Sequence, residues 1–313
     1  MVDGPNLKSP RIAIALALDD QFVAPARAMI ESIRRHGELD HAGLFVLTTG
    51  LKSSSITALE DSASGAGLSL KIRTINDIGE LGSIADWAIS TCLRLYVGDV
   101  CDCERALYLD SDMLVLSSLA PLLQMNLGDA TAAAVVNYPP IDVMRIAIRR
   151  SQRGEVNPNA PYFNAGVLLV DVDRWRSRAI GSRSRAFLKR FPRTRLLDQD
   201  ALNMVLVNDW TQLDKEWNTP AGSLDESPML RGLAQMNRSM LDSVNEWERA
   251  QKQPRILHFT GQPKPWEHNY PWPGLKEQYR GFMLPEFGVF PTSQSKVLAD
   301  ETGDQRIRHF QRT

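Results

Sequence analysis

The stretch "RALYLDSDMLVL", residues 105–116, places two carboxylates between two apolar segments. Residues 106–109 predict a buried strand, and the chain turns apolar again over residues 113–116. Asp110 and Asp112 are two positions apart, so in an extended chain both side chains point to the same face. Two neighbouring carboxylates repel each other and are costly beside a core strand unless a cation lies between them. The pattern predicts a site for Mg²⁺ or Mn²⁺, with a surface turn of two solvated aspartates as the alternative.

The composition is that of an ordinary globular protein of one large or two small domains. The chain has 313 residues, 43% hydrophobic and 23% charged, with a net charge of −1. That charge balance gives no general attraction to nucleic acid or to an anionic membrane. The seven-residue apolar run 12–18 ends in two aspartates without a cleavage site and is shorter than the roughly 18 to 20 residues of a membrane span. Three sparse cysteines fit a reducing compartment, so we expect a cytoplasmic protein.

Apolar strand patterns alternate with helical patterns over the first 110 residues. Strands are expected at 11–18, 44–47, 68–75 and 106–109, and helices at 24–35, 53–62 and 84–97. This alternation predicts a parallel, doubly wound α/β sheet, in which ligands bind at the carboxyl ends of the strands. Asp19 follows the first of these strands, and Asp110 follows the fourth.

The later part of the chain carries weaker signals. Further strands are expected at 130–136, 167–170 and 256–259, with helices from about Arg174 and near Asp200. The Arg-rich segment 139–161 predicts a helix and loop that cover the strand ends as a lid. The chain has neither a dinucleotide-binding glycine motif after its first strand nor a P-loop lysine, which disfavours a dinucleotide oxidoreductase and a P-loop NTPase.

Three further motifs contain residues suited to binding a ligand. "YFNAGVLLVDVDRW", residues 162–175, places Asn164–Gly166 just before an apolar strand, where a glycine lets backbone approach a ligand. "LLDQDALN", residues 196–203, groups Asp198–Asp200 at a helix start, where N-capping by Asp198 is the structural alternative. "ILHFTGQPKPW", residues 256–266, offers an imidazole, a glycine and a lysine in one loop, a set that could close over a metal diphosphate.

Taken together with "ALALDDQF", residues 15–22, these motifs resemble the retaining glycosyltransferases of family 8, in order, over about residues 11 to 270. That family includes bacterial lipooligosaccharide galactosyl- and glucosyltransferases and glycogenin. The resemblance implies a GT-A fold, an α/β architecture whose Rossmann-like, mostly parallel central sheet is flanked by helices. It implies one glycosyltransferase domain over 11–280, with a nucleotide-binding half (11–115), an acceptor and catalytic half (116–280) and a C-terminal tail (281–313).

The resemblance also assigns roles to individual residues. It makes Asp110, Asp112 and His258 the metal ligands, and Asp198 and Gln199 the catalytic pair at the reacting sugar. The UDP-sugar contacts that it implies are Ala17, Asp19, Gln21, Arg94, Asp110, Ser111, Asn137, Asn164, Ala165, Gly166, Gly261 and Lys264. Asp19 suits the uracil N3–H. Gln21 departs from the shorter Asn that is common in the family, and Asn137 stands where some members use an Asp that touches the sugar hydroxyls.

The expected reaction is transfer of glucose or galactose from a UDP-sugar to a glycan, a lipid-linked saccharide or another hydroxyl acceptor, with Mn²⁺ or alternatively Mg²⁺. Front-face attack and a double displacement through Asp198 or Gln199 both remain open. The rival hypotheses are a non-catalytic nucleotide-sugar-binding protein and a metal-dependent phosphohydrolase or nucleotidyltransferase.

The acceptor and the location of the protein are less defined by the sequence. Arg145, Arg149, Arg150 and Arg153 suit an acidic or phosphorylated glycan, and a solvated helix face is the alternative. The basic C-terminal tail leaves peripheral contact with the inner face of the membrane open. We expect no nucleic-acid partner, and the oligomeric state is undecided.

Overall fold

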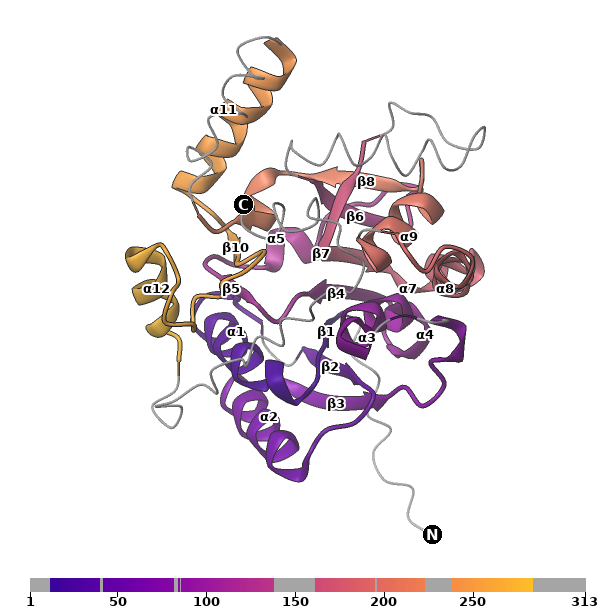
Figure 1. Cartoon of the computed structure of the whole chain (residues 1–313), viewed down its shortest axis with the longest axis horizontal. Helices are drawn as coiled ribbons and strands as arrows, with labels where there is room; N and C mark the ends of the chain where they lie inside the picture. The colour runs from indigo at the N-terminus through magenta and orange to yellow at the C-terminus, as the bar shows by residue number, and fades with distance from the viewer. Residues whose placement is uncertain are drawn as a thin grey trace, which may run out of the picture.

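The computed structural model describes residues 12–39, 42–81, 84, 86–137, 161–194, 196–222 and 238–283. Its centre is a seven-stranded sheet with the order β3-β2-β1-β4-β7-β6-β8 (Figure 1). The first four strands in sequence are β1 (Ile12–Ala17), β2 (Gly43–Thr48), β3 (Ser69–Thr74) and β4 (Arg105–Leu109). They run parallel, which confirms the predicted doubly wound sheet in the first part of the chain.

Helices cover both faces of this sheet. The helices α1 (Val23–His36) and α2 (Ser53–Gly65) lie on one side, and α3 (Asp86–Cys92) and α4 (Val97–Val100) lie on the other (Figure 1). The alternation of β1 explains this arrangement, because Ile14 and Leu16 pack into one buried cluster while the smaller Ala13 and Ala15 pack into the second.

The predicted helix at 84–97 is wrong in detail. The segment consists of α3, the 3₁₀ helix η3 (Leu93–Tyr96) and α4. All four side chains of η3 are buried, a pattern that an amphipathic helix with one outward face does not allow. The tighter helix therefore places Arg94 inside the protein.

The second half of the sheet contains one strand of opposite direction. The long strand β7 (Phe163–Asp171) runs antiparallel to both β4 and β6 (Ala132–Val136), and β8 (Trp210–Leu213) runs parallel to β6. Asn164–Gly166 lie inside β7, whereas the sequence predicted them before a shorter strand. The reason is a register shift in β6 between Ala134 and Val135, which extends the pairing to Asn164 and Phe163.

A three-stranded sheet with the order β5-β10-β9 flanks the large one. Its strands are β5 (Met113–Val115), β10 (Ile256–His258) and β9 (Thr219–Pro220). Because β10 runs antiparallel to β5 and pairs His258 with Met113, the histidine lies beside the residue that follows Asp112. This pairing joins two motifs that are almost 150 residues apart.

The remaining elements are α-helices and 3₁₀ helices between and after these strands. They are η1 (Asp20–Phe22), η2 (Gly79–Leu81), α5 (Ala120–Leu123), α7 (Val172–Ser177), α8 (Ile180–Arg190), α9 (Leu197–Val205), η5 (Lys215–Asn218), α11 (Arg238–Lys252) and α12 (Pro273–Arg280). In the described part of the chain, no helix combines the length and apolarity needed to cross a bilayer. The predicted lid at 139–161, all but its last residue and including its four arginines, lies outside the described residues, as does the tail beyond 283.

Candidate active site

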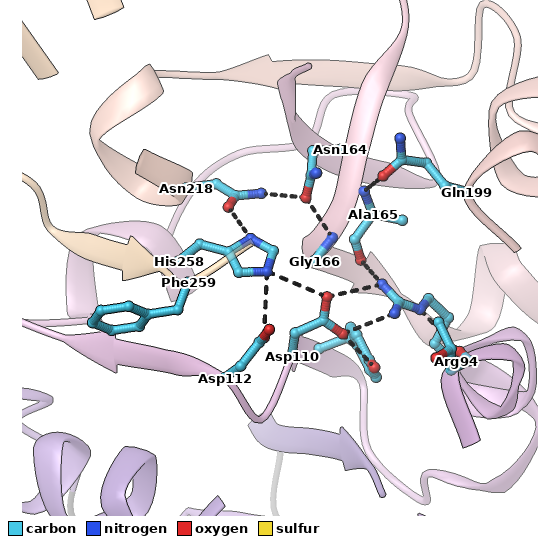
Figure 2. Close-up of polar contacts among 12 residues, drawn as sticks. Arg94, Asp110, Asp112, Asn164, Ala165, Gly166, Gln199, Asn218, His258 and Phe259 are labelled. Atoms are coloured by element: carbon cyan, nitrogen blue, oxygen red, sulfur yellow. Dashed lines mark hydrogen bonds and ion pairs between the residues drawn. The ribbon is translucent and has the colours of Figure 1, made fainter. Parts of the chain in front are cut away.

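The three predicted metal ligands meet at the junction of the two sheets (Figure 2). Asp110 and Asp112 lie in the turn between β4 and β5, and His258 ends β10. One ligand atom from each residue lies within 4.8 Å of the others. The His258 Nε2 atom is 3.3 Å from Asp112 Oδ1 and 3.7 Å from Asp110 Oδ2. The sequence thus predicted this convergence correctly.

The donor set fits a divalent cation. Two carboxylates and one imidazole suit Mn²⁺, and carboxylates alone suit Mg²⁺. Three protein ligands also leave coordination positions for phosphate oxygens. Backbone hydrogen bonds hold the turn in place, from Asp110 N to Gly166 O (2.9 Å) and from Phe259 N to Asp112 O (3.0 Å).

Arg94 links the metal-binding candidates to the catalytic candidates. Its guanidinium is buried, with Nη2 2.8 Å from Asp110 Oδ1 and Nε 2.8 Å from Asp198 Oδ2. Its Nη1 atom donates to Ala165 O (2.7 Å), and the group stacks on the Tyr108 ring at 4.9 Å. Arg94 therefore neutralises two carboxylates at once, which makes both of them tolerable in the interior.

Asp198 is not the helix cap that the structural alternative proposed. The N-cap of α9 is Leu196, and Asp198 lies in the first turn, buried against Arg94. Burial raises the pKa of Asp198 to about 6, partly opposed by Arg94 and reinforced by Asp110.

This raised pKa predicts how stability depends on pH. The folded protein holds the Asp198 proton up to about pH 6, whereas an unfolded aspartate loses it near 3.8. The contribution of Asp198 to the free energy of unfolding is therefore fully present below pH 4. About 3 kcal/mol of this contribution is lost as the pH rises through 6. We expect Asp198→Asn to gain up to that amount over the wild type between pH 4 and pH 7, measured by urea unfolding. A difference that stays constant across this range would contradict the shift.

The neighbours of Asp198 are held by hydrogen bonds. Gln199 Oε1 accepts from Ala165 N (3.0 Å). Asp200 accepts from the Tyr162 hydroxyl (2.5 Å) and from Leu196 N (3.0 Å), so it stabilises the start of α9. Burial, together with the Asp200 charge, raises the pKa of Tyr162 well above its usual value.

Lys264 is buried beside the metal-binding candidates. Its buried Nζ atom is 2.5 Å from Asp112 Oδ2 and donates to Phe259 O at 2.7 Å. Burial alone would raise the pKa of Asp112, but the Lys264 ammonium holds it well below its usual range.

The nucleoside candidates lie one strand away, at the carboxyl end of β1. Asp19 Oδ1 accepts from Gln21 N (2.9 Å), and the Ser90 hydroxyl donates to Asp19 Oδ2 (3.2 Å). Ala17 is the last residue of β1, and Gln21 is exposed. Since β1 and β4 are parallel neighbours, this end of β1 lies next to Asp110.

The remaining candidates divide between the site and its rim. Asn164 Nδ2 donates to Asn137 Oδ1 (3.2 Å), and Ser111 is buried between the two aspartates. Gly261 is exposed, with a φ of 75° that favours glycine. Gly166 makes room for the metal ligand itself, because a Cβ atom there would lie 2.5 Å from His258 Cε1.

Sequence reasoning missed two residues of this network. The Tyr108 hydroxyl donates to Asp110 Oδ1 (2.9 Å), and the i, i+2 rule that paired Asp110 with Asp112 also predicts this neighbour. Asn218 forms hydrogen bonds of 2.8 Å with both His258 and Asn164. It ends a four-residue 3₁₀ helix, which is too short to be predicted from hydrophobic periodicity.

Comparisons with known proteins agree with this geometry. The family model for glycosyl transferase family 8 matches residues 13–270. General stress protein A of Bacillus subtilis (strain 168) is 24% identical over 279 residues, covering 86% of this chain and 92% of that protein. Lipopolysaccharide 1,3-galactosyltransferase of Salmonella typhimurium is 26% identical over 261 residues, 81% of this chain and 72% of that protein.

The fold also matches solved structures. The galactosyltransferase LgtC, in complex with donor and acceptor sugar analogs, superposes with a TM-score of 0.66 at 23% identity, covering 88% of this chain and 98% of that one. The architecture is therefore the expected GT-A fold, that of an enzyme which transfers a sugar. The chain belongs to glycosyl transferase family 8.

Proposed function

We propose that the enzyme transfers a hexose, glucose or galactose, from a UDP-sugar to a hydroxyl of a glycan or lipid-linked saccharide, with retention at the anomeric carbon. The observation that carries this proposal is the convergence of Asp110, Asp112 and His258 beside the Arg94–Asp198 ion pair at the carboxyl ends of the strands. Two relatives support these two sugars: the lipopolysaccharide 1,3-galactosyltransferase named above, and a lipopolysaccharide glucosyltransferase of Escherichia coli (strain K12) that is 24% identical over 266 residues.

Asp110, Asp112 and His258 would hold Mn²⁺, or alternatively Mg²⁺, which when bound offsets the negative charge that grows on the leaving diphosphate. The ammonium of Lys264 lies beside the Asp112 carboxylate and adds positive charge at the metal-binding candidates. On the nucleoside side, Asp19 has the position and the acceptor oxygens for the uracil N3–H. The turn at Gly261 would contribute a backbone N–H.

The route to retention is also part of the proposal. The charge of Asp198 is paired with Arg94, and Gln199 is a neutral amide whose oxygen accepts from Ala165 N, so neither group has an adjacent base or a free charge that would activate it as a nucleophile. These contacts favour front-face attack, in which the leaving phosphate oxygen takes the proton of the acceptor hydroxyl. Trapping of a glycosyl-enzyme on either residue would instead support double displacement.

The direct test measures UDP release from UDP-glucose and UDP-galactose, with Mn²⁺, with Mg²⁺ and with chelator, and identifies acceptor products by mass spectrometry. Calorimetry should show tighter binding of UDP than of GDP or ADP. Tight UDP-sugar binding without turnover would support the non-catalytic alternative, and release of inorganic phosphate or pyrophosphate would support the phosphohydrolase or nucleotidyltransferase alternative.

Lys264→Met should lower kcat about a hundredfold, because its charge stabilises the leaving group most as the C–O bond breaks. Since Lys264 is buried against Asp112, the substitution should also lower thermal stability, unlike the small change expected of a surface lysine. Turnover at saturating donor and Tm are measured on Lys264→Met and on the control Lys189→Met, whose lysine is exposed in the last turn of α8. Unchanged kcat with weaker donor binding would mean that Lys264 binds ground state and transition state equally.

The place of the reaction and the domain limits complete the proposal. The three cysteines are free, which supports the cytoplasm, with peripheral membrane contact through the tail 281–313 as the alternative. We place the nucleotide-binding half at 11–115 and the acceptor half at 116–280.

A further inference from the structure

His258 has two ring nitrogens with different surroundings (Figure 2). Its Nε2 atom faces Asp112 and Asp110, while Nδ1 lies 2.8 Å from Asn218 Oδ1, in a buried environment. A neutral imidazole carries its proton on one of these atoms only. It can therefore ligate a cation through Nε2 only if Nδ1 holds the proton.

The orientation of the surrounding amides follows from one backbone group. The Gly166 N–H is a donor without acceptor capacity, so the Asn164 atom 2.9 Å away is its carbonyl oxygen. The same oxygen lies 2.8 Å from Asn218, which must present its NH₂ group there. The other end of the Asn218 amide, toward His258, is then its oxygen. Turning this amide over would place two acceptors against each other.

This hydrogen-bond network also determines which ring nitrogen of His258 carries the proton. Asn218 Oδ1 requires a donor, so Nδ1 of His258 carries the proton and Nε2 presents its lone pair to the carboxylates. A lone pair between two carboxylates is repulsive, whereas a cation among the three atoms is attracted by all of them. We propose that Asn218 is a positioning residue that fixes this tautomer of His258, an inference that rests on the metal site of the proposed function.

The fold holds Asn218 in this position through the small sheet. Asn218 ends η5 and is directly followed by β9, which pairs with β10 so that Thr219 lies opposite Leu257 and Pro220 opposite His258. The imidazole is thus carried on β10, and the amide lies at the end of η5, immediately before the strand that pairs with β10. Asn164 extends the network to Asn137, the residue expected near the donor sugar.

Two substitutions separate the two ends of the Asn218 amide. Asn218→Asp keeps an acceptor for Nδ1 and loses the donor to Asn164, while Asn218→Leu keeps the size and loses both. Asn203→Leu is the matched control, because Asn203 is also buried and bonds the Phe163 backbone at 2.8 and 2.9 Å. Asn203→Leu should lower the stability of the protein as Asn218→Leu does, but it should leave the tautomer of His258 unchanged.

The primary readout is ¹⁵N NMR of histidine-labelled, metal-free protein at pH 8, with the His258 signals assigned through His258→Gln. Wild type, Asn218→Asp and Asn203→Leu should show a protonated Nδ1, and Asn218→Leu should shift the proton toward Nε2. The second readout is Mn²⁺ affinity by electron paramagnetic resonance, where Asn218→Leu should bind 10- to 100-fold more weakly than wild type, about the loss seen when an outer partner of a metal ligand is removed.

The outcomes distinguish this inference from the proposed function. A wild-type His258 that carries its proton on Nε2 overturns the inference. Because this measurement needs no variant, the inference can be tested even if Asn218→Leu does not fold. An unchanged tautomer and Mn²⁺ affinity in Asn218→Leu overturn it while the metal site stands. Wild-type protein that holds the proton on Nδ1 yet binds no Mn²⁺ removes the metal site and leaves the hydrogen-bond assignment intact.

Discussion

Asp112→Asn should abolish metal-dependent sugar transfer, by about a thousandfold or more, while leaving the fold intact. The carboxylate faces His258 through Oδ1 and Lys264 through Oδ2, so it joins the metal-binding candidates to the lysine. Asparagine keeps the shape and removes the charge. The interaction of a bound cation with the leaving group amounts to several kcal/mol, and about 4 kcal/mol corresponds to this change in rate.

Two further variants make this measurement specific. Asp110→Asn should lose as much transfer activity, although Arg94 keeps Asp198 as a partner there. Asp102→Asn is the control, because Asp102 is an exposed carboxylate that pairs with Lys71 on the surface. Turnover is measured at saturating Mn²⁺ on protein whose folding is verified by circular dichroism. Near-normal turnover of Asp110→Asn or Asp112→Asn under those conditions would falsify the assignment of the metal site.

Local periodicity was enough to predict the first half of the sheet. β1 to β4 are apolar runs separated by helices, and this alternation allows few arrangements other than parallel strands. The same rule of two-residue spacing predicted that Asp110 and Asp112 share a face, and the resemblance to family 8 added His258. The sequence pattern that predicts the position of each of these residues lies within a few neighbouring residues or within a known motif.

The parts that sequence reasoning missed depend on contacts between distant segments. The true start of β7 depends on its irregular pairing with β6, a strand about 30 residues earlier in the chain, and sequence periodicity does not show this pairing. β9 has two residues and β10 has three, so neither is long enough to show an alternation, yet their pairing places Asn218 against His258. The burial of Arg94 likewise requires the 3₁₀ turn of η3, where helical periodicity predicted a continuous helix.

Arg94→Met should have the largest effect on stability. Arg94 is 5% exposed and lies between Asp110 and Asp198, and its loss leaves the buried Asp198 and the partly buried Asp110 without their shared cation. Removing one partner of a buried ion pair typically costs about 3 to 5 kcal/mol, whereas the half-exposed pair of Arg255 with Glu216 should be worth less than about 1 kcal/mol. Arg255→Met is therefore the control, and both are measured by urea unfolding of metal-free protein.

The pH dependence of this loss identifies its cause. In the wild type, Asp198 has a pKa of about 6, so at pH 5 it is largely protonated and gains little from Arg94, whereas at pH 8 it is ionised and paired. The destabilisation by Arg94→Met should therefore grow from pH 5 to pH 8, and the double variant Arg94→Met/Asp198→Asn should recover part of it at pH 8. Turnover of Arg94→Met should fall at least about a hundredfold even where the protein is folded, because the same guanidinium orients Asp110 and the Ala165 carbonyl. A small loss that is independent of pH would mean that Asp198 is neutral in the wild type as well, and the front-face route would then have to proceed beside an uncharged Asp198.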